Sequence, residues 1–360
     1  MKDIFELQSE VSRKIAVALR GELSVIDSEK LGAGKPHHFE VFNLYIKGRY
    51  YWSLRTEEGF QRSLQHYQEA IARDSGYAPA YAGMADTYSL MGMYGMMAQA
   101  DAVSRANAAA TKAIELDGSL AEAHASLGYI QKNRFEWAAA EASFRRAIEL
   151  KPGYAQAHHW YSIYLSQHGR FSEAIAESKL AISLDPLATS TNAQLGTVLL
   201  LARRYDEAIT QYQRILQEDS TFASAHQIIG EAYSYKRDYH RALASFEMAV
   251  KAGALGREDH EQMADKGFAL AMSGRGREAM EVLAELLARH RRNPKGVSAN
   301  IATVYTALGS TELAFTFLSQ ALELRDSEIG YLKVDPRWDR LRSDQRFDSL
   351  LARVGFKAGS

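Results

Sequence analysis

Alanine recurs at an interval of 34 residues in the middle of this chain, at Ala140, Ala174, Ala208 and Ala242. A second column with the same interval holds small residues: Gly128, Ser162, Gly196 and Gly230. A third column holds Ala147, Ala181, Ile215 and Ala249. Three independent columns with one period indicate a repeat protein, in which every repeat is one small unit of secondary structure.

Each repeat has the pattern of two amphipathic helices joined by a short polar turn. Small residues that face each other across the hairpin would let the helix axes approach, and the later alanine would let the next repeat nest. Larger residues on the same stripe are expected to fill the space between layers: Phe144, Tyr212, Phe246 and Leu318. Pro152 and Pro186 should end second helices, because proline lacks the backbone donor. One hairpin cannot bury its apolar stripe alone, so the sequence predicts an all-α, right-handed α-solenoid of stacked helix hairpins.

The segment SLGYIQKNRFEWAAAEASFRRAIELKP (126–152) resembles the tetratricopeptide repeat (TPR) family, whose helix pairs have this period and this small-large-small pattern. About eight such repeats are expected over 41–325, which is about four-fifths of the chain. The first repeat carries extra residues near Arg55–Glu58, and the second is lengthened between Gly92 and Ala106. An N-terminal helix (1–24), a linker (25–40) and a C-terminal cap (326–360) would complete the chain.

Both ends depart from the period, as the ends of a solenoid must if they are to cover its last apolar layers. At the C-terminus, the residues expected to form a cap are Leu332, Val334, Trp338, Leu341, Phe347, Leu350 and Leu351. There DPRWD predicts a proline-started turn and SDQRFDSLL an N-capped short helix. At the N-terminus, Ile4, Leu7, Val11, Ile15 and Leu19 mark one side of a helix. We expect that helix either to fold back onto the array or to pair with a second chain, which would give a homo-oligomer.

Two stretches resemble a narrower family. DIFELQSEVSRKIAVAL (3–19) is similar to the last helix of the TolB-like segment of large bacterial signalling proteins, and YLKVDPRWDRLRSDQRF (331–347) to the TPR arrays that follow it. Such arrays occur behind winged-helix, adenylate cyclase or protein kinase domains. The resemblance implies a regulatory or interaction module of a bacterial signal-transduction or transcription-regulator protein. It implies a cytoplasmic location, or a periplasmic one if a membrane anchor precedes this region.

Composition limits the kinds of partner. The 43 Lys and Arg residues nearly balance 44 Asp and Glu residues, for a formal charge of -1, which argues against a nucleic-acid binder. The chain has no cysteine, which excludes disulfides and thiolate chemistry. No apolar run approaches the roughly 20 residues that a membrane-spanning helix needs, so no membrane segment is expected in this chain.

The sequence shows no catalytic constellation. His124, His158 and His226 suggest metal ligands, but they occupy one repeat column. Recurrence at the repeat interval indicates a structural role, because the ligands of one metal ion must converge at a single point. We therefore expect no enzyme activity, no cofactor and no metal site.

The first helix of each repeat should line the concave side of a solenoid, and its exposed face is the expected binding site. The predicted lining is Tyr45, Arg49, Trp52, Asp86, Ser89, Leu90, Tyr129, Lys132, Asn133, His159, Ile163, Gln167, Gln227, Glu231 and Tyr235. This mixed aromatic and polar surface favours a scaffold that binds a protein or an extended peptide. Tyr45, Arg49 and Trp52 are the sharpest candidates, although Trp52 could instead fill the enlarged first hairpin. Self-association is the alternative function, and an enzyme with an unrecognised site is the least favoured.

Overall fold

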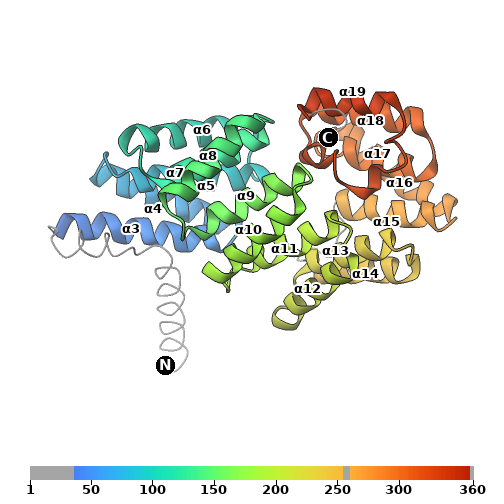
Figure 1. The fold of residues 1–360 in the computed structure, drawn as a ribbon, viewed down its shortest axis with the longest axis horizontal. Helices are drawn as coiled ribbons and strands as arrows, with labels where there is room; N and C mark the ends of the chain where they lie inside the picture. Colours follow the sequence, from blue (N-terminus) through green and yellow to red (C-terminus); the bar gives the residue numbers. More distant parts are fainter. Residues whose placement is uncertain (1–35, 254–259, 357–360) are drawn as a thin grey trace. The chain divides into compact units, whose positions relative to one another are not determined.

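The computed structural model describes residues 36–253 and 260–356. Within these ranges the chain forms successive helix hairpins (Figure 1), which confirms the predicted all-α class of stacked hairpins. The first four hairpins are α3 (Pro36–Ser53) with α4 (Glu57–Arg73), α5 (Ala78–Met93) with α6 (Gln99–Leu116), α7 (Ala121–Asn133) with α8 (Trp137–Leu150), and α9 (Ala155–Gln167) with α10 (Phe171–Leu184). The next four are α11 (Thr189–Leu201) with α12 (Tyr205–Glu218), α13 (Ala223–Tyr235) with α14 (Tyr239–Ala252), α15 (His260–Met272) with α16 (Gly276–Arg292), and α17 (Ser298–Leu308) with α18 (Thr311–Leu324).

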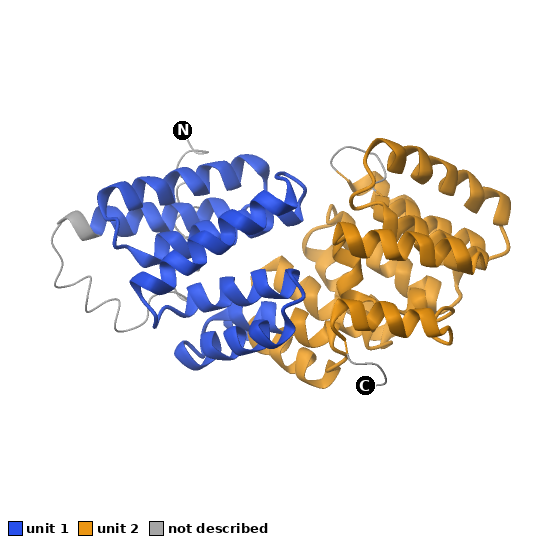
Figure 2. Ribbon diagram, turned by 90° about the horizontal axis from the view of Figure 1, so that it is seen from above, with its two compact units in different colours: residues 1–161, 183–185 blue, residues 162–182, 186–360 orange. Residues whose placement is uncertain are grey.

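The chain divides into two compact units (Figure 2). Unit 1 comprises Met1–Tyr161 and Ser183–Asp185, and unit 2 comprises Ser162–Ile182 and Pro186–Ser360. In unit 1 the first helices of successive hairpins contact one another, α3 with α5 and α5 with α7. In unit 2 the same holds for α11 with α13, α13 with α15, and α15 with α17. The side of each unit formed by these helices is its first-helix face.

A glycine packed against an aromatic ring sets the spacing within several hairpins. A Cβ atom on Gly128 would lie 2.9 Å from the ring of Phe144, and Gly230 meets Phe246 in the same way. A Cβ atom on Gly196 would lie closer still, against the ring of Tyr212. The predicted small column therefore faces the large residue of its own hairpin rather than another small residue. The alanine columns are buried as expected, with Ala140, Ala147, Ala174, Ala181, Ala208, Ala242 and Ala249 fully inaccessible.

Hairpin turns repeat one backbone feature that the sequence pattern did not reveal. Phe135, Arg203 and Arg237 each have φ of 62°, and Gly169, in the same column, has φ of 77°. These residues lie 34 positions apart, so each turn closes with one residue in the left-handed region, although only one of the four is glycine. Arg55 holds the corresponding place in the first hairpin, with φ of 55°.

The histidine column has the structural role that its spacing predicts. His124 Nε2 lies 3.0 Å from the carbonyl oxygen of Gly118, and His158 Nε2 lies 2.8 Å from that of Pro152. In the next repeat the amide of Asn192 donates to the carbonyl oxygen of Pro186 at 3.2 Å. Each side chain thus bonds six residues back, to the turn that precedes its own helix.

The C-terminal segment contains two 3-10 turns, η1 (Ser327–Tyr331) and η2 (Pro336–Trp338), and then α19 (Gln345–Val354). Asp335 and Asp344 accept backbone hydrogen bonds at the starts of η2 and α19, as the turn and the capped helix predicted from the sequence require. All the apolar residues predicted for this segment are buried. Arg346 pairs with Glu312 of α18 at 2.7 Å, so the segment packs on the last hairpin.

Two expectations lie wholly or partly outside the described residues: the N-terminal helix at 1–24 and most of the linker at 25–40. α3 already begins at Pro36, within the expected linker. Among the helices that the structure describes, none combines the length and the apolarity needed to cross a membrane.

Candidate functional site

The first-helix face of unit 1 brings together polar residues from three hairpins. Arg49 Nη1 of α3 lies 2.8 Å from Asp86 Oδ2 of α5. The hydroxyl of Ser126, on α7, donates to the other carboxylate oxygen of Asp86. Asp86 is only 1% exposed, and this burial raises the pKa of its carboxyl group to about 6 although Arg49 opposes the shift. Two predicted site residues, Arg49 and Asp86, therefore form one buried ion pair.

Trp52 is stacked between two guanidinium groups. The Cζ atoms of Arg49 and Arg55 lie 4.2 Å and 3.7 Å from the centre of its ring. Trp52 is 5% exposed, and its Nε1 is buried with no hydrogen-bond acceptor in the described part of the chain. Trp52 thus fills space at the end of the first hairpin, as one of the two sequence interpretations expected. Its ring also makes cation–π contacts with Arg49 and Arg55 at the edge of the first-helix face.

Arg55 is the most unusual residue of this face. Its Nη1 is buried and has no hydrogen-bond partner among the described residues. Burial lowers the pKa of its guanidinium to about 10, and the nearby charge of Arg49 acts in the same direction. Ser89 Oγ, on α5, is likewise buried without a partner. A buried donor that lacks an acceptor costs about 1–3 kcal/mol, so these groups are better satisfied by a ligand than by the chain itself.

Tyr129, Lys132 and His159 extend the face along α7 and α9. Lys132 Nζ lies 4.8 Å from the centre of the Tyr129 ring, and burial lowers the pKa of this lysine to about 8. Tyr129 stacks on Trp160 with ring centres 4.7 Å apart, and Asn133 hydrogen-bonds its hydroxyl group. Burial, with a smaller contribution from Arg55, lowers the pKa of His159 to about 3, so this imidazole is neutral.

We call these residues the unit 1 cluster: Arg49, Trp52, Arg55, Asp86, Ser126, Tyr129, Lys132, Asn133 and His159. Its cationic side chains are Arg49, Arg55 and Lys132, and its one carboxylate is Asp86. The positive side chains therefore outnumber the negative one, and one of them presents a buried N–H group without an acceptor. Such an arrangement favours binding of an anionic group.

Unit 2 gives a different result for the positions predicted there. Gln227, Glu231 and Tyr235 lie on the first-helix face. Residues of the chain's own C-terminal segment contact two of them, Glu231 and Tyr235. Arg337 Nη2 lies 3.3 Å from Glu231, and the Tyr235 hydroxyl donates to Asp335 at 3.1 Å. The expectation of an open lining at this repeat is therefore wrong, because the segment that was predicted to cover the end of the array also lies along this face.

Arg337 is surrounded by carboxylates. It lies 3.6 Å from Asp265 of α15 and 2.8 Å from Asp335, in addition to Glu231 of α13. Gln227 donates a hydrogen bond to Asp265 at 3.0 Å. Burial raises the pKa of Asp265 to about 8 although Arg337 opposes it, and burial together with the charge of Asp265 raises that of Glu231 well above its usual range. Negative groups exceed the single cation at this place.

Two other predicted residues have simpler places. Tyr45 packs in the core of the first hairpin with Val41 and Tyr67, so its ring does not line an open face. Ile163 is half-buried on α9.

The sequence did not identify Arg55 and Ser126 as site residues. Arg55 lies in the irregular part of the first repeat, and only its position in the hairpin turn could have drawn attention to it.

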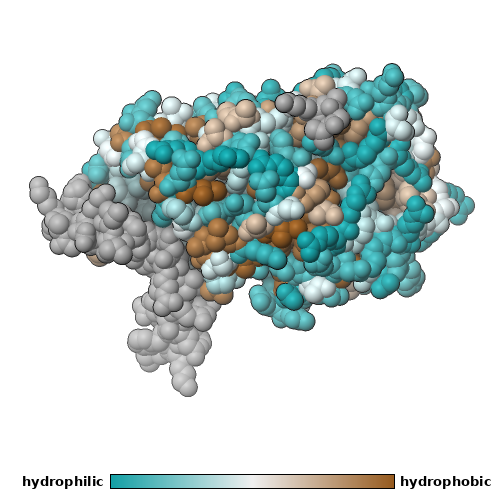
Figure 3. Space-filling view, in the orientation of Figure 1, coloured by the Kyte–Doolittle hydropathy of each residue, from teal (hydrophilic) through white to brown (hydrophobic). Residues whose placement is uncertain are grey.

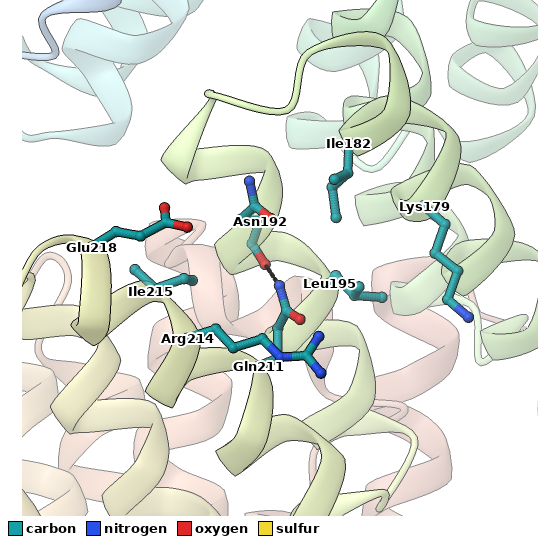
Figure 4. A pocket seen from close by; sticks show the side chains of 8 residues that line it. All are labelled: Lys179, Ile182, Asn192, Leu195, Gln211, Arg214, Ile215 and Glu218. Atoms are coloured by element: carbon teal, nitrogen blue, oxygen red, sulfur yellow. Dashed lines mark hydrogen bonds between the residues drawn. The ribbon is translucent and has the colours of Figure 1, made fainter.

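A surface pocket of about 260 Å³ lies elsewhere in unit 2, between α10, α11 and α12 (Figure 4). Lys179, Ile182, Asn192, Leu195, Gln211, Arg214, Ile215 and Glu218 line it. Gln211 reaches across to the backbone oxygen of Asn192 at 3.2 Å. The pocket contains none of the residues predicted to bind a ligand.

The surface in Figure 3 mixes hydrophilic and hydrophobic residues, and the hydrophobic ones form several separate groups. Among the exposed apolar side chains are three on the first two hairpins, Leu54, Met93 and Tyr94, which are 44%, 51% and 48% exposed. They follow α3 or end α5, at the same end of these helices as Arg55. Among the described residues, no three His, Asp or Glu side chains are grouped so that they could hold a metal ion.

Solved structures with the same fold are similar to this chain at low sequence identity. The human IFIT1 dimer with PPP-AAAA is 14% identical with a TM-score of 0.54, over 78% of this chain and 72% of that one. The APC/C hetero-tetramer Cut9–Hcn1 is 17% identical with a TM-score of 0.52, over 68% of this chain and 45% of that one. YrrB, a TPR protein with an unusual peptide-binding site, is 22% identical with a TM-score of 0.37, over 52% of this chain and 91% of that one.

No protein-family model matches the sequence, and no curated protein matches it. The likeness of the hairpins to solved structures, together with the repeat period, shows that the chain has the tetratricopeptide-repeat fold.

Proposed function

From this tetratricopeptide-repeat fold and the unit 1 cluster, we propose that the chain is a scaffold that binds a partner protein through an extended acidic segment. The binding surface is the first-helix face of unit 1. Arg49, Arg55 and Lys132 recognise carboxylates of the partner, and the buried rings of Trp52 and Tyr129 hold these cations in place. The exposed side chains of Leu54, Met93 and Tyr94 contact the apolar parts of the partner. No bond is made or broken, so the function is recognition rather than catalysis.

The observation that carries the proposal is the buried Nη1 of Arg55 without an acceptor. A guanidinium pairs best with a planar carboxylate, which can accept two parallel hydrogen bonds. Asp86 is already engaged by Arg49 and Ser126, so the described part of the chain leaves the acceptor for Arg55 to a ligand. The lowered pKa of Arg55 is consistent with this, because burial destabilises the charged guanidinium and the nearby negative charge is too small to offset that cost.

The rigidity of the surface favours binding. Stacked hairpins hold the unit 1 cluster in place before a ligand arrives, so little ordering entropy is lost on the protein side. Leu54, Met93 and Tyr94 add exposed apolar surface at the edge. Aromatic and arginine side chains of this kind dominate the energetics of many protein interfaces.

We also propose that this scaffold is the regulatory or interaction module of a bacterial signal-transduction or transcription-regulator protein, in the cytoplasm or the periplasm. The support for this context is the resemblance of 3–19 and 331–347 to TolB-like segments and the arrays behind them. Self-association through the N-terminal helix stays a prediction, because that helix lies outside the described residues.

Calorimetric titration tests the proposal. We expect the full chain to bind a peptide of alternating glutamate and leucine more tightly than its glutamine counterpart, with an affinity that falls as salt increases. Arg55→Ala should weaken binding at least tenfold without loss of stability, because the side chain has a buried donor without an acceptor. Arg62→Ala, on the exposed side of α4, is the matched control and should bind like the parent. Equal affinity for the two peptides would overturn the proposal.

A further inference from the structure

The segment Leu332–Arg342, which we call the strap, lies along the first-helix face of unit 2. Asp339 Oδ2 lies 2.7 Å from Arg203 Nη1, in the turn after α11. Asp335 accepts a hydrogen bond from Tyr235 of α13, and Arg337 reaches Glu231 of α13 and Asp265 of α15. Further along, Arg340 Nη1 donates to the backbone oxygen of Ala307 of α17 at 2.8 Å. A few consecutive residues of the strap therefore touch four successive hairpins.

This pattern of contacts is that of a peptide ligand bound across a repeat array. Such a ligand runs across successive repeats and places one or two side chains on each of them. The strap does this with Asp335, Arg337, Asp339 and Arg340, while Trp338 is buried between them. The strap contains no α-helix: it consists of the 3-10 turn η2 over Pro336–Trp338 with further turns on either side of it.

The charge of the surface beneath the strap is complementary to a cation. α13 and α15 supply Glu231 and Asp265, and both carboxylates face Arg337. Glu261 and Glu328 add negative charge nearby, and Asp335 belongs to the strap itself. Without Arg337, this part of unit 2 would have buried carboxylates and no cation against them. Its natural occupant is therefore a segment that carries an arginine.

The fit of the strap is incomplete. Within 36–253 and 260–356, Glu231 Oε1 is buried without a hydrogen-bond partner, and so is Trp338 Nε1. A permanent core contact would be expected to satisfy such groups, because each unmet one weakens it. On either side, the strap is joined to parts that have their own contacts. Asp326 accepts backbone hydrogen bonds from Gly296 and Ala299, and α19 packs on α18. Both ends of the strap are thus held by contacts that do not involve the first-helix face.

We infer that the first-helix face of α13 and α15 is a second peptide-binding surface, specific for an arginine-bearing segment, and that the strap occupies it as an exchangeable ligand in cis. A partner with an arginine between acidic and aromatic residues binds there by displacing the strap. Because the strap is tethered, its effective concentration at the surface is on the order of millimolar. A partner must therefore have a higher affinity for the surface than the strap has, or the contacts of the strap must first be weakened. The inference does not depend on the function proposed for unit 1.

The test uses the full chain and a fluorescent peptide with the sequence of Lys333–Leu341, KVDPRWDRL. In the parent, the strap competes and the peptide should bind weakly. In the Arg337→Ala chain, the strap has lost its main contact, and we expect the peptide to bind at least tenfold more tightly. The same peptide with alanine at the position of Arg337 should lose this gain. Arg346→Ala, which removes an arginine of α19 outside the strap, should bind like the parent.

A gain in the Arg337→Ala chain that needs the arginine of the peptide would support the inference, and a folded variant that shows no gain would overturn it. If that variant does not fold, hydrogen exchange of the parent decides. We expect the amide hydrogens of Val334 and Trp338 to exchange at least tenfold faster than those at the centre of α17. Equal exchange rates at both places would show that the strap opens only on global unfolding, and would overturn the inference.

Discussion

The first-helix faces of the two units are built from the same kind of hairpin but have opposite charge. In unit 1, Arg49, Arg55 and Lys132 stand against Asp86. In unit 2, Glu231 and Asp265 lie against the one guanidinium of Arg337, which comes from the C-terminal strap. Among the residues that the structure describes, a buried donor of Arg55 in unit 1 has no acceptor, and a buried acceptor of Glu231 in unit 2 has no donor.

This difference in charge shows that the packing residues repeat along the chain, whereas the residues of the first-helix face do not. The glycines, alanines and turn residues that recur at the repeat interval build both units in the same way. The residues of the first-helix face do not recur, so each unit can present its own chemistry on a common frame. In unit 2 the strap occupies the first-helix face, and its contacts illustrate how a peptide segment can lie on such a face.

The largest expected effect comes from Arg337→Ala, which removes the cation from unit 2. Breaking a buried ion pair costs about 3–5 kcal/mol, because it leaves unpaired charge inside the protein. We expect a loss near the lower end, about 3 kcal/mol, since an exchangeable strap can open and let Glu231 and Asp265 reach water. Arg346→Ala should cost less than about 1 kcal/mol, because its ion pairs are exposed. Equal losses in urea unfolding of the two variants would contradict this account of unit 2.

A smaller effect should be the same in both units, because it concerns the common frame. Gly128→Leu in unit 1 and Gly196→Leu in unit 2 each drive a side chain into the ring of Phe144 or Tyr212. Overpacking of this kind costs about 1–3 kcal/mol, which exceeds the gain in helix propensity. Thermal and urea unfolding should show losses of similar size. Gly153→Ala, where no atom lies within 4 Å of the added carbon, should be neutral, and an unchanged melt of either leucine variant would refute the packing.

The smallest effect is a difference between the two units in how the free energy of unfolding depends on pH. A carboxyl group whose pKa is higher in the folded than in the unfolded state stabilises the fold below its unfolded pKa, and this stability is lost as pH rises through the folded value. For Asp86, with a folded pKa of about 6, little of the loss is left above about pH 6.5, whereas for Asp265, with a pKa of about 8, it continues through pH 8. We expect the free energy of unfolding to fall by about 1–2 kcal/mol between pH 6.5 and pH 8.5.

Two variants assign that slope. Asp265→Asn should reduce it, because the amide does not titrate, while Asp86→Asn should leave it unchanged in this range. A free energy of unfolding that rises with pH between these values, or a slope that depends on Asp86, would contradict the difference between the units.

The sequence was sufficient to predict the frame. The 34-residue columns identified the hairpins, the buried alanines and the helix ends, because close packing needs small side chains at fixed places. The apolar residues of the C-terminal segment were also recognised correctly as buried, since Trp338 and Phe347 could hardly be left in water.

The sequence was insufficient for the contacts between distant residues. Arg337 and Glu231 are 106 positions apart, and nothing in either repeat indicates that they meet. The strap was therefore predicted only as an end cover, and Gln227, Glu231 and Tyr235 as an open lining. Arg55 was overlooked for a related reason: its role follows from the left-handed turn that it occupies, and the irregular first repeat hid that turn.

The indole N–H resonance of Trp52 tests most directly whether the unit 1 cluster is the binding site for an acidic segment. Its Nε1 is buried beside Arg49 and Arg55, and Trp338 in the strap supplies an internal comparison. Variants with phenylalanine at each tryptophan assign the signals in a nitrogen-proton correlation spectrum. On titration with the glutamate–leucine peptide, we expect the Trp52 signal to move and saturate while the Trp338 signal stays. Movement of Trp338 with Trp52 unchanged would contradict it.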